Sequence, residues 1–164
     1  MILKTAHETW PDEASCQQSA ARLAACPELR DAIIELHGEL GAGKTTFARN
    51  LLRAMGIIGP IKSPTYALME SYEPPFSGKS VLTSGPASHF DFYRFDDPQE
   101  WEDAGLRDIF ATPGLKLIEW PEKALGLLPQ PDVSLFLDCV SDPIRHVRWE
   151  ALSPRGIALL PTST

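Results

Sequence analysis

Short, largely apolar runs alternate with amphipathic segments along the first half of the chain, a pattern typical of strands separated by helices. The runs at 32–37 and 115–119 are short and mostly apolar, as expected for strands that are buried on both faces of a parallel sheet. Further extended segments are predicted at 66–72, 89–95, 133–140 and 146–151. The alternation predicts an α/β fold, and the closely spaced strands at the C-terminal end predict antiparallel additions at the edge of its sheet.

Four helices are predicted, at about 11–25, 44–55, 98–104 and 121–126. Thr9 is the predicted N-cap of the first helix, because the proline and the acidic residues that follow suit a first turn. Pro27 ends that helix, since the residue before a proline leaves helical space. The prolines and glycines between 73 and 88 predict a long surface connection with one short strand near Val81.

Residues 38–45 read GELGAGKT, the G-x-x-x-x-G-K-T pattern of a P-loop, between a predicted strand and a predicted helix. Main-chain N–H groups of such a loop point inward together, and the helix N-terminus adds about half a positive charge. Lys44 is therefore predicted to contact the β- and γ-phosphates of ATP and to be catalytic, and Thr45 to ligate Mg²⁺. The alternative is an ordinary glycine turn before a helix. The predicted nucleotide-binding set is Glu39, Leu40, Gly41, Ala42, Gly43, Lys44, Thr45 and Thr46.

The charge of the chain narrows its class of partner. The net charge is −7 over 164 residues, and the isoelectric point is about 5.0. Direct binding to a nucleic-acid backbone is disfavoured, because phosphate contacts need clustered basic side chains. Arg145, Arg148 and Arg155 come nearest to such a cluster and are interpreted as a solvated face or a protein contact, with an RNA contact as the alternative.

Length and apolar content predict one domain, 1–164, of a cytoplasmic protein. The N-terminal segment lacks the apolar stretch of a signal peptide, and no apolar run approaches the roughly 20 residues of a membrane helix. The three cysteines are widely spaced and show no zinc pattern, which fits thiols in a reducing compartment. We expect no membrane partner.

Four separated blocks of the sequence stand out: GELGAGKTTF at 38–47, KSPTY at 62–66, HFDFYR at 89–94 and IEWPE at 118–122. Together they resemble the TsaE (YjeE) family, the ATPase subunit of bacterial tRNA threonylcarbamoyladenosine synthesis. The resemblance runs from the first predicted helix to the final strands. It departs from the family pattern in the connection from Pro74 to Ser88, which is longer and richer in proline and glycine than expected.

The resemblance implies a P-loop NTPase fold, a three-layer sandwich whose central, mainly parallel sheet has antiparallel edge strands and is flanked by helices. It implies binding of ATP and Mg²⁺ and an ATPase that is weak alone and activated by partners. Those partners are TsaB and TsaD, which transfer a threonylcarbamoyl group to adenosine in tRNA. The chain is then an ATP-driven switch on TsaB–TsaD and meets tRNA only through the complex.

Five residues outside the P-loop complete the predicted site. The resemblance favours Asp91 and Glu119 as catalytic carboxylates that hold Mg²⁺ directly or through water, Glu119 because strand ends face the ligand crevice of α/β sheets. The alternative for Asp91 is a solvent-facing strand residue, and the alternative for Glu119 is an acid near the start of a helix. Ser63 and Thr65 are a predicted switch that senses the γ-phosphate, or a plain proline turn. Trp120 covers the site, contacts a partner, or is a packing residue.

Other residues and functions are weighed against these. His89 is interpreted as a packed or hydrogen-bonded histidine rather than a catalytic base. Arg94 and Arg107 are candidates for stabilising transition-state charge, or they form surface ion pairs. A small-molecule kinase and a nucleotide-dependent interaction module remain alternatives to the ATPase switch. A GTPase is disfavoured, because the Asn-Lys-x-Asp motif is missing.

Overall fold

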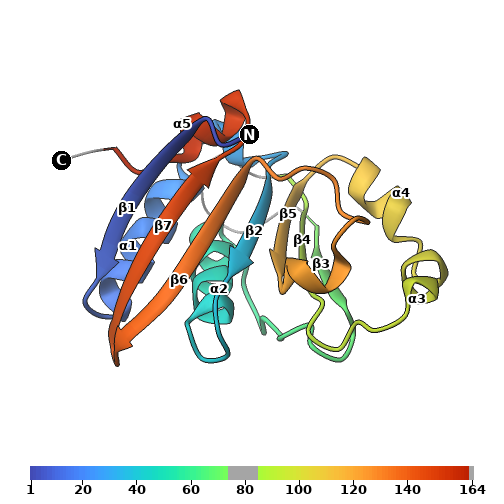
Figure 1. Cartoon of the computed structure of the whole chain (residues 1–164). Helices are drawn as coiled ribbons and strands as arrows, with labels where there is room; N and C mark the ends of the chain where they lie inside the picture. Colours follow the sequence, from blue (N-terminus) through green and yellow to red (C-terminus); the bar gives the residue numbers. More distant parts are fainter. Residues whose placement is uncertain (74–84, 163–164) are drawn as a thin grey trace.

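The computed structural model describes residues 1–73 and 85–162, which build one seven-stranded sheet with helices around it (Figure 1). The strands, in sheet order, are β1 (Lys4–Trp10), β7 (Ile144–Ala151), β6 (Val133–Ser141), β2 (Ile33–His37), β5 (Leu115–Glu119), β4 (Ala87–Asp91) and β3 (Met69–Tyr72). The helices are α1 (Glu13–Ala24), α2 (Lys44–Ala54), α3 (Pro98–Asp103), α4 (Leu106–Ala111) and α5 (Pro154–Leu159), with 3₁₀ turns η1 (Pro27–Leu29) and η2 (Pro121–Ala124). The expected strand near Val81 lies outside the described residues.

The centre of the sheet is parallel and its edges are antiparallel. Strands β6, β2, β5 and β4 run parallel to one another. Strands β7 and β1 at one side, and β3 at the other, pair antiparallel. The central strand β5 is buried at all five positions, as a strand covered on both faces must be. The predicted α/β fold class is confirmed.

Two apolar cores lie on opposite faces of the sheet. Helices α1 and α2, which Figure 1 shows together behind β7, β6 and β2, cover the larger core with side chains such as Leu23 and Phe47. The smaller core packs Phe90 and Ile118 from β4 and β5 against Trp101 of α3 and the start of α4. Because residues alternate along a strand, Asp91 and Glu119 at the strand ends face the side of α2.

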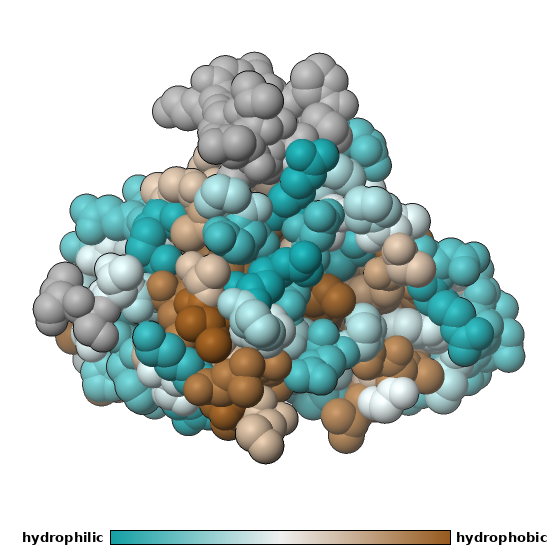
Figure 2. Space-filling view, turned by 90° about the horizontal axis from the view of Figure 1, so that it is seen from above, coloured by the Kyte–Doolittle hydropathy of each residue, from teal (hydrophilic) through white to brown (hydrophobic). Residues whose placement is uncertain are grey.

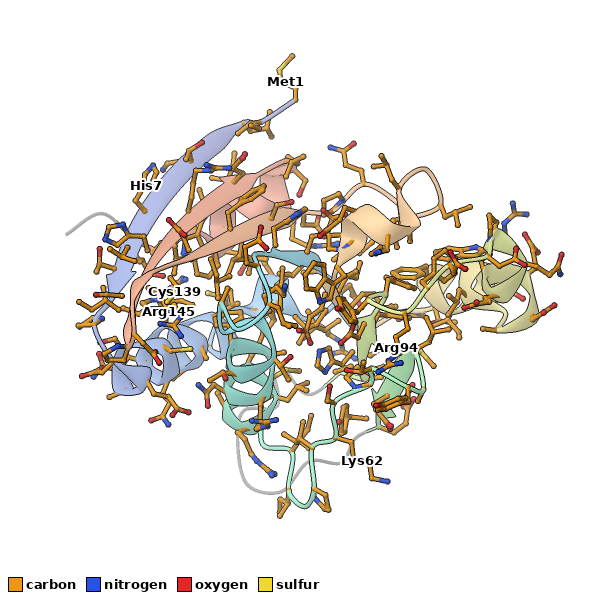
Figure 3. All side chains as sticks on the ribbon, turned by 60° about the horizontal axis from the view of Figure 1, so that its bottom comes forward. Met1, His7, Lys62, Arg94, Cys139 and Arg145 are labelled. Carbon is orange, nitrogen blue, oxygen red and sulfur yellow. The ribbon has the colours of Figure 1, made fainter. Side chains whose placement is uncertain are left out.

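The first strand was not predicted, and Thr9 is part of it rather than a helix cap (His7 marks this strand in Figure 3). Asp12 caps α1 instead, accepting a hydrogen bond of 2.9 Å from the N–H of Ser15. Strand β1 exists because it pairs along its whole length with β7, more than 130 residues away, which no local pattern shows. The segments predicted at 66–72 and 89–95 are strands only at β3 and β4, and α4 and α5 were not predicted.

The surface seen from above is mainly hydrophilic, with smaller hydrophobic patches toward one edge of that view (Figure 2). Within the described residues, no helix combines the length and apolar character that crossing a membrane requires.

Candidate functional site

The loop from β2 to α2 has a backbone that only glycines adopt without strain. Gly38, Gly41 and Gly43 have φ of 153°, 82° and 105°. A Cβ at Gly38 would lie 2.7 Å from the carbonyl oxygen of Leu137 in β6, so the strand leaves no room for a side chain. The loop enters α2 directly at Lys44. The free N–H groups of the helix start therefore add to those of the loop, which favours an anion.

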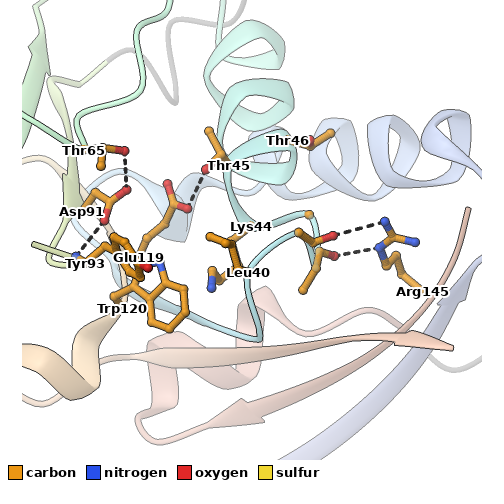
Figure 4. Close-up of a pocket in the computed structure, with 13 residues that line it drawn as sticks. Leu40, Lys44, Thr45, Thr46, Thr65, Asp91, Tyr93, Glu119, Trp120 and Arg145 are labelled. Carbon is orange, nitrogen blue, oxygen red and sulfur yellow. Dashed lines mark hydrogen bonds between the residues drawn. The ribbon is translucent and has the colours of Figure 1, made fainter. Parts of the chain in front are cut away.

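This loop forms one wall of a pocket of about 330 Å³, and the ends of β4 and β5 form the other (Figure 4). The lining residues are Leu40, Gly41, Ala42, Gly43, Lys44, Thr45, Thr46, Thr65, Asp91, Tyr93, Glu119, Trp120 and Arg145. The structure thus brings together all but two of the predicted site residues. Glu39 precedes Leu40 and Ser63 lies two residues before Thr65, but neither lines the pocket.

The two carboxylates lie side by side because Asp91 and Glu119 are paired in register on parallel strands. Glu119 Oε1 accepts a hydrogen bond of 2.7 Å from the hydroxyl of Thr45. Asp91 accepts one of 3.1 Å from the Thr65 hydroxyl and one of 2.9 Å from the N–H of Tyr93. Glu119 is 2% exposed and Asp91 is 5% exposed. Two carboxylates and a hydroxyl are hard oxygen donors, which suit Mg²⁺.

His89 supports Glu119 from inside the sheet. A ring nitrogen of His89 lies 2.6 Å from Glu119 Oε2, and the histidine is 1% exposed. His89 is therefore a buried, hydrogen-bonded residue that touches a carboxylate of the pocket without lining the pocket itself.

Lys44 is buried in the pocket with its ammonium against the loop. Nζ donates hydrogen bonds to the carbonyl oxygens of Gly38 and Glu39. It also lies 3.5 Å from the centroid of the Trp120 ring, within cation–π range. Burial lowers the pKa of Lys44, and the neighbouring carboxylates, Glu119 first among them, act in the opposite direction.

Trp120 lies over this ammonium from a strained backbone position. Its φ of 56° is left-handed, which is uncommon for a bulky residue. Its ring centroid is 5.0 Å from that of Tyr93. The tryptophan is thus a wall of the pocket, next to the carboxylates.

The predicted switch segment is tied to the end of β4. The hydroxyls of Ser63 and Thr65 are 2.8 Å apart, and Thr65 in turn donates to Asp91. One hydrogen bond therefore connects the Asp91 carboxylate to this segment.

Neither candidate arginine borders the pocket. Arg94 donates a hydrogen bond of 3.2 Å to the hydroxyl of Tyr66 and stacks over that ring. Arg107 belongs to α4 and lines a separate cavity. The arginine at the loop is Arg145, which the sequence analysis interpreted as part of a solvated face or a protein contact, with an RNA contact as the alternative. Its contact with Ala42 spans 103 positions of the chain, so local pattern carried no signal for it.

Comparisons with known proteins agree on one family. The family model "Threonylcarbamoyl adenosine biosynthesis protein TsaE" matches residues 10–147. The tRNA threonylcarbamoyladenosine biosynthesis protein TsaE of Haemophilus influenzae is 44% identical over 110 residues, covering 67% of this chain and 65% of that protein, just under two thirds of its length. The protein of the same name from Bacillus subtilis is 33% identical, covering 75% of this chain and 72% of its own.

A solved structure supports the fold. The crystal structure of YdiB from Bacillus subtilis superposes with a TM-score of 0.74 at 24% sequence identity, covering 97% of this chain and 93% of that one.

Proposed function

We propose, from the premise that this chain belongs to the TsaE family of threonylcarbamoyl adenosine biosynthesis proteins, that it binds and hydrolyses Mg-ATP in support of that tRNA modification. The observation that carries the proposal is the pocket in which the P-loop, with Lys44 and Thr45, faces the carboxylates of Asp91 and Glu119. The whole chain, 1–164, is on this account one cytoplasmic ATPase domain.

The phosphates of ATP are the ligand that suits the loop side of the pocket. Inward N–H groups and the start of α2 attract negative charge without needing a side chain. Lys44, now against the Trp120 ring and two carbonyl oxygens, is within the same pocket and would turn its ammonium to the β- and γ-phosphates.

Thr45, Asp91 and Glu119 are the residues that would hold Mg²⁺. The fit rests on their chemistry, since one hydroxyl and two nearly buried carboxylates supply only oxygen donors. Among residues 1–73 and 85–162, no group of three or more His, Cys, Asp or Glu side chains forms a metal site by itself, so phosphate oxygens would complete the set. Bound there, the ion would supply positive charge that offsets the negative charge of the phosphates.

The nucleoside has room on the other side of the loop. A second cavity of about 200 Å³ is lined by Trp10, Asp12 and Pro143, and it shares Thr46 and Arg145 with the first. Because the carboxylates mark the γ-phosphate end, the ribose and base would extend toward this cavity.

Hydrolysis by the chain alone should be slow. Glu119 or Asp91 can orient the attacking water as a buried carboxylate. In the part of the chain that the structure describes, Lys44 and Arg145 are the only cationic side chains lining the pocket, and Arg145 binds the outer side of the loop. P-loop enzymes that lack a transition-state arginine lose about 10³- to 10⁵-fold in rate. A partner that completes the site would restore it, and the family context makes TsaB–TsaD that partner, with tRNA reached only through them.

The proposal is tested by measuring the products of ATP turnover with and without TsaB–TsaD. We expect ADP and free phosphate, formed slowly by the chain alone and at least about tenfold faster with the partners. A phosphorylated acceptor in place of free phosphate would make the protein a kinase. Equal rates with and without the partners would refute the coupling.

A further inference from the structure

We propose that Arg145 is a positioning residue that holds the P-loop in its phosphate-binding shape before any nucleotide arrives. The inference rests on the proposed function, because it gives Arg145 a part in the same site. Arg145 lies near the start of β7, directly after the turn from β6, and its side chain reaches the outer side of the loop (Figure 4).

The guanidinium binds two successive carbonyl oxygens of the loop. Nε donates to Ala42 at 2.8 Å, and Nη2 donates to Gly41 at 3.4 Å. The same group also contacts its own hairpin, at the Asp142 carboxylate (3.2 Å) and the Ile144 carbonyl (3.3 Å). The side chain is 17% exposed. It is therefore a partly buried fork that ties the P-loop to the β6–β7 hairpin.

A phosphate-binding loop needs such a tie for a geometric reason. When the N–H groups of a loop converge on an anion, its carbonyl groups turn outward and need donors of their own. Arginine suits this task, because it stays protonated and presents several donors in a fixed plane. The contact to Ala42 and Gly41 satisfies outward carbonyls and leaves the inner side of the loop free.

The glycines of the loop have little packing to hold them at this point. A Cβ placed on Gly41 would meet nothing within 4 Å, and one on Gly43 would meet only Arg145 and Leu137 within that distance. Glycines lose more conformational freedom on ordering than other residues. Ala42 between these glycines is buried in the core, and its N–H donates to the carbonyl of Glu39. The two glycines have no such packing, so their order depends on hydrogen bonds, and Arg145 supplies two to this part of the loop.

Arg145 thus differs in kind from Lys44. Lys44 lies inside the pocket and would touch the phosphates, whereas Arg145 acts through the shape of the loop. Its removal should raise the dissociation constant for Mg-ATP, because part of the binding free energy is then spent on ordering the loop.

The test compares Arg145→Ala, Arg145→Lys and the control Arg148→Ala. Arg148 is three residues further along β7, is 48% exposed and stacks on Phe136 rather than the P-loop. We expect the amides of residues 39–43 to exchange with solvent about tenfold faster in nucleotide-free Arg145→Ala, and the dissociation constant for Mg-ATP to rise about tenfold. Arg145→Lys should give exchange rates and a dissociation constant between those of the wild type and Arg145→Ala, since lysine keeps the positive charge but lacks the planar set of donors. Arg148→Ala should match the wild type in both measurements.

Unchanged exchange at 39–43 in Arg145→Ala would overturn the proposal, as would faster exchange confined to the hairpin. If Arg145→Ala does not fold, wild-type behaviour of Arg145→Lys at 39–43 overturns it equally. Exchange is measured without nucleotide, so it decides about Arg145 even if the wild type fails to bind Mg-ATP, a failure that would instead refute the proposed function.

Discussion

At the scale of single residues, the site is a small set of charges withdrawn from water. Lys44, Asp91 and Glu119 are each at most 5% exposed. Each is held by a neighbour, the lysine by loop carbonyls and Trp120, the carboxylates by hydroxyl and N–H donors. Burying a charge costs free energy unless it is paired, and these neighbours offset part of that cost.

Replacing Lys44 with alanine should separate binding from stability. The variant loses the ammonium for the phosphates, so we expect its affinity for Mg-ATP to fall on the order of 100-fold. Its free energy of unfolding should not fall, because a desolvated charge is removed. Calorimetry measures the affinity for Mg-ATP, and urea denaturation measures the free energy of unfolding. Wild-type affinity in the variant would exclude Lys44 from the site.

The lowered pKa of Lys44 predicts a pH dependence of stability. Burial makes the folded pKa lower than the unfolded one. Between these two values the unfolded chain binds more protons, so the contribution of Lys44 to stability rises with pH up to about 10.4. The difference in unfolding free energy between Lys44→Ala and wild type should therefore shrink as pH rises from 7 to 10. A constant difference across that range would contradict the assignment.

Glu119→Gln should affect turnover more than binding. The amide keeps the size of the side chain and can still meet Thr45, but it cannot orient water as a carboxylate does. We expect the hydrolysis rate to fall by about 10²-fold while the affinity for ATP changes only a few-fold. Single-turnover kinetics with radiolabelled ATP measure both, and normal turnover would show that another group does this work.

At the scale of elements, local pattern predicted the loop, the central strands and antiparallel additions at the edge, but not the edge strand β1. Strand β5 and the P-loop carry their own signals, an apolar run and fixed glycines. Strand β1 carries none, because it depends on pairing with β7. The position of Arg145 has the same origin, since only the β6–β7 hairpin brings it to the loop. Contacts between residues far apart in the chain leave no local pattern from which a single sequence could predict them.

Glu8 shows how strongly β1 is tied in. One of its carboxylate oxygens accepts hydrogen bonds from Ser19 of α1 (2.8 Å) and from Trp149 of β7 (2.9 Å). Glu8→Ala leaves the indole N–H of a fully buried tryptophan unpaired, so we expect a loss of about 1–3 kcal/mol in stability. The control is His7→Ala, an exposed change on the same strand, which should cost little in urea denaturation. Equal effects of the two changes would mean that Glu8 does not anchor the strand.

At the scale of the whole molecule, the chain presents one P-loop pocket at the carboxyl ends of its parallel strands, where α/β folds bind ligands. Exposed apolar side chains stand beside it, with Leu40 75% exposed and Tyr66 84% exposed. Four short blocks of the sequence predicted the family and named most of the residues that meet in this pocket. The sequence did not predict the contacts between the β6–β7 hairpin and the P-loop.

The most direct measurement is a calorimetric titration of the folded wild-type protein with Mg-ATP, with Lys44→Ala as the control. A pocket of main-chain N–H groups, one ammonium and oxygen donors for Mg²⁺ predicts saturable heat in the wild type and almost none in the variant. No heat from the wild type at millimolar Mg-ATP, or the same isotherm for both proteins, would contradict the account.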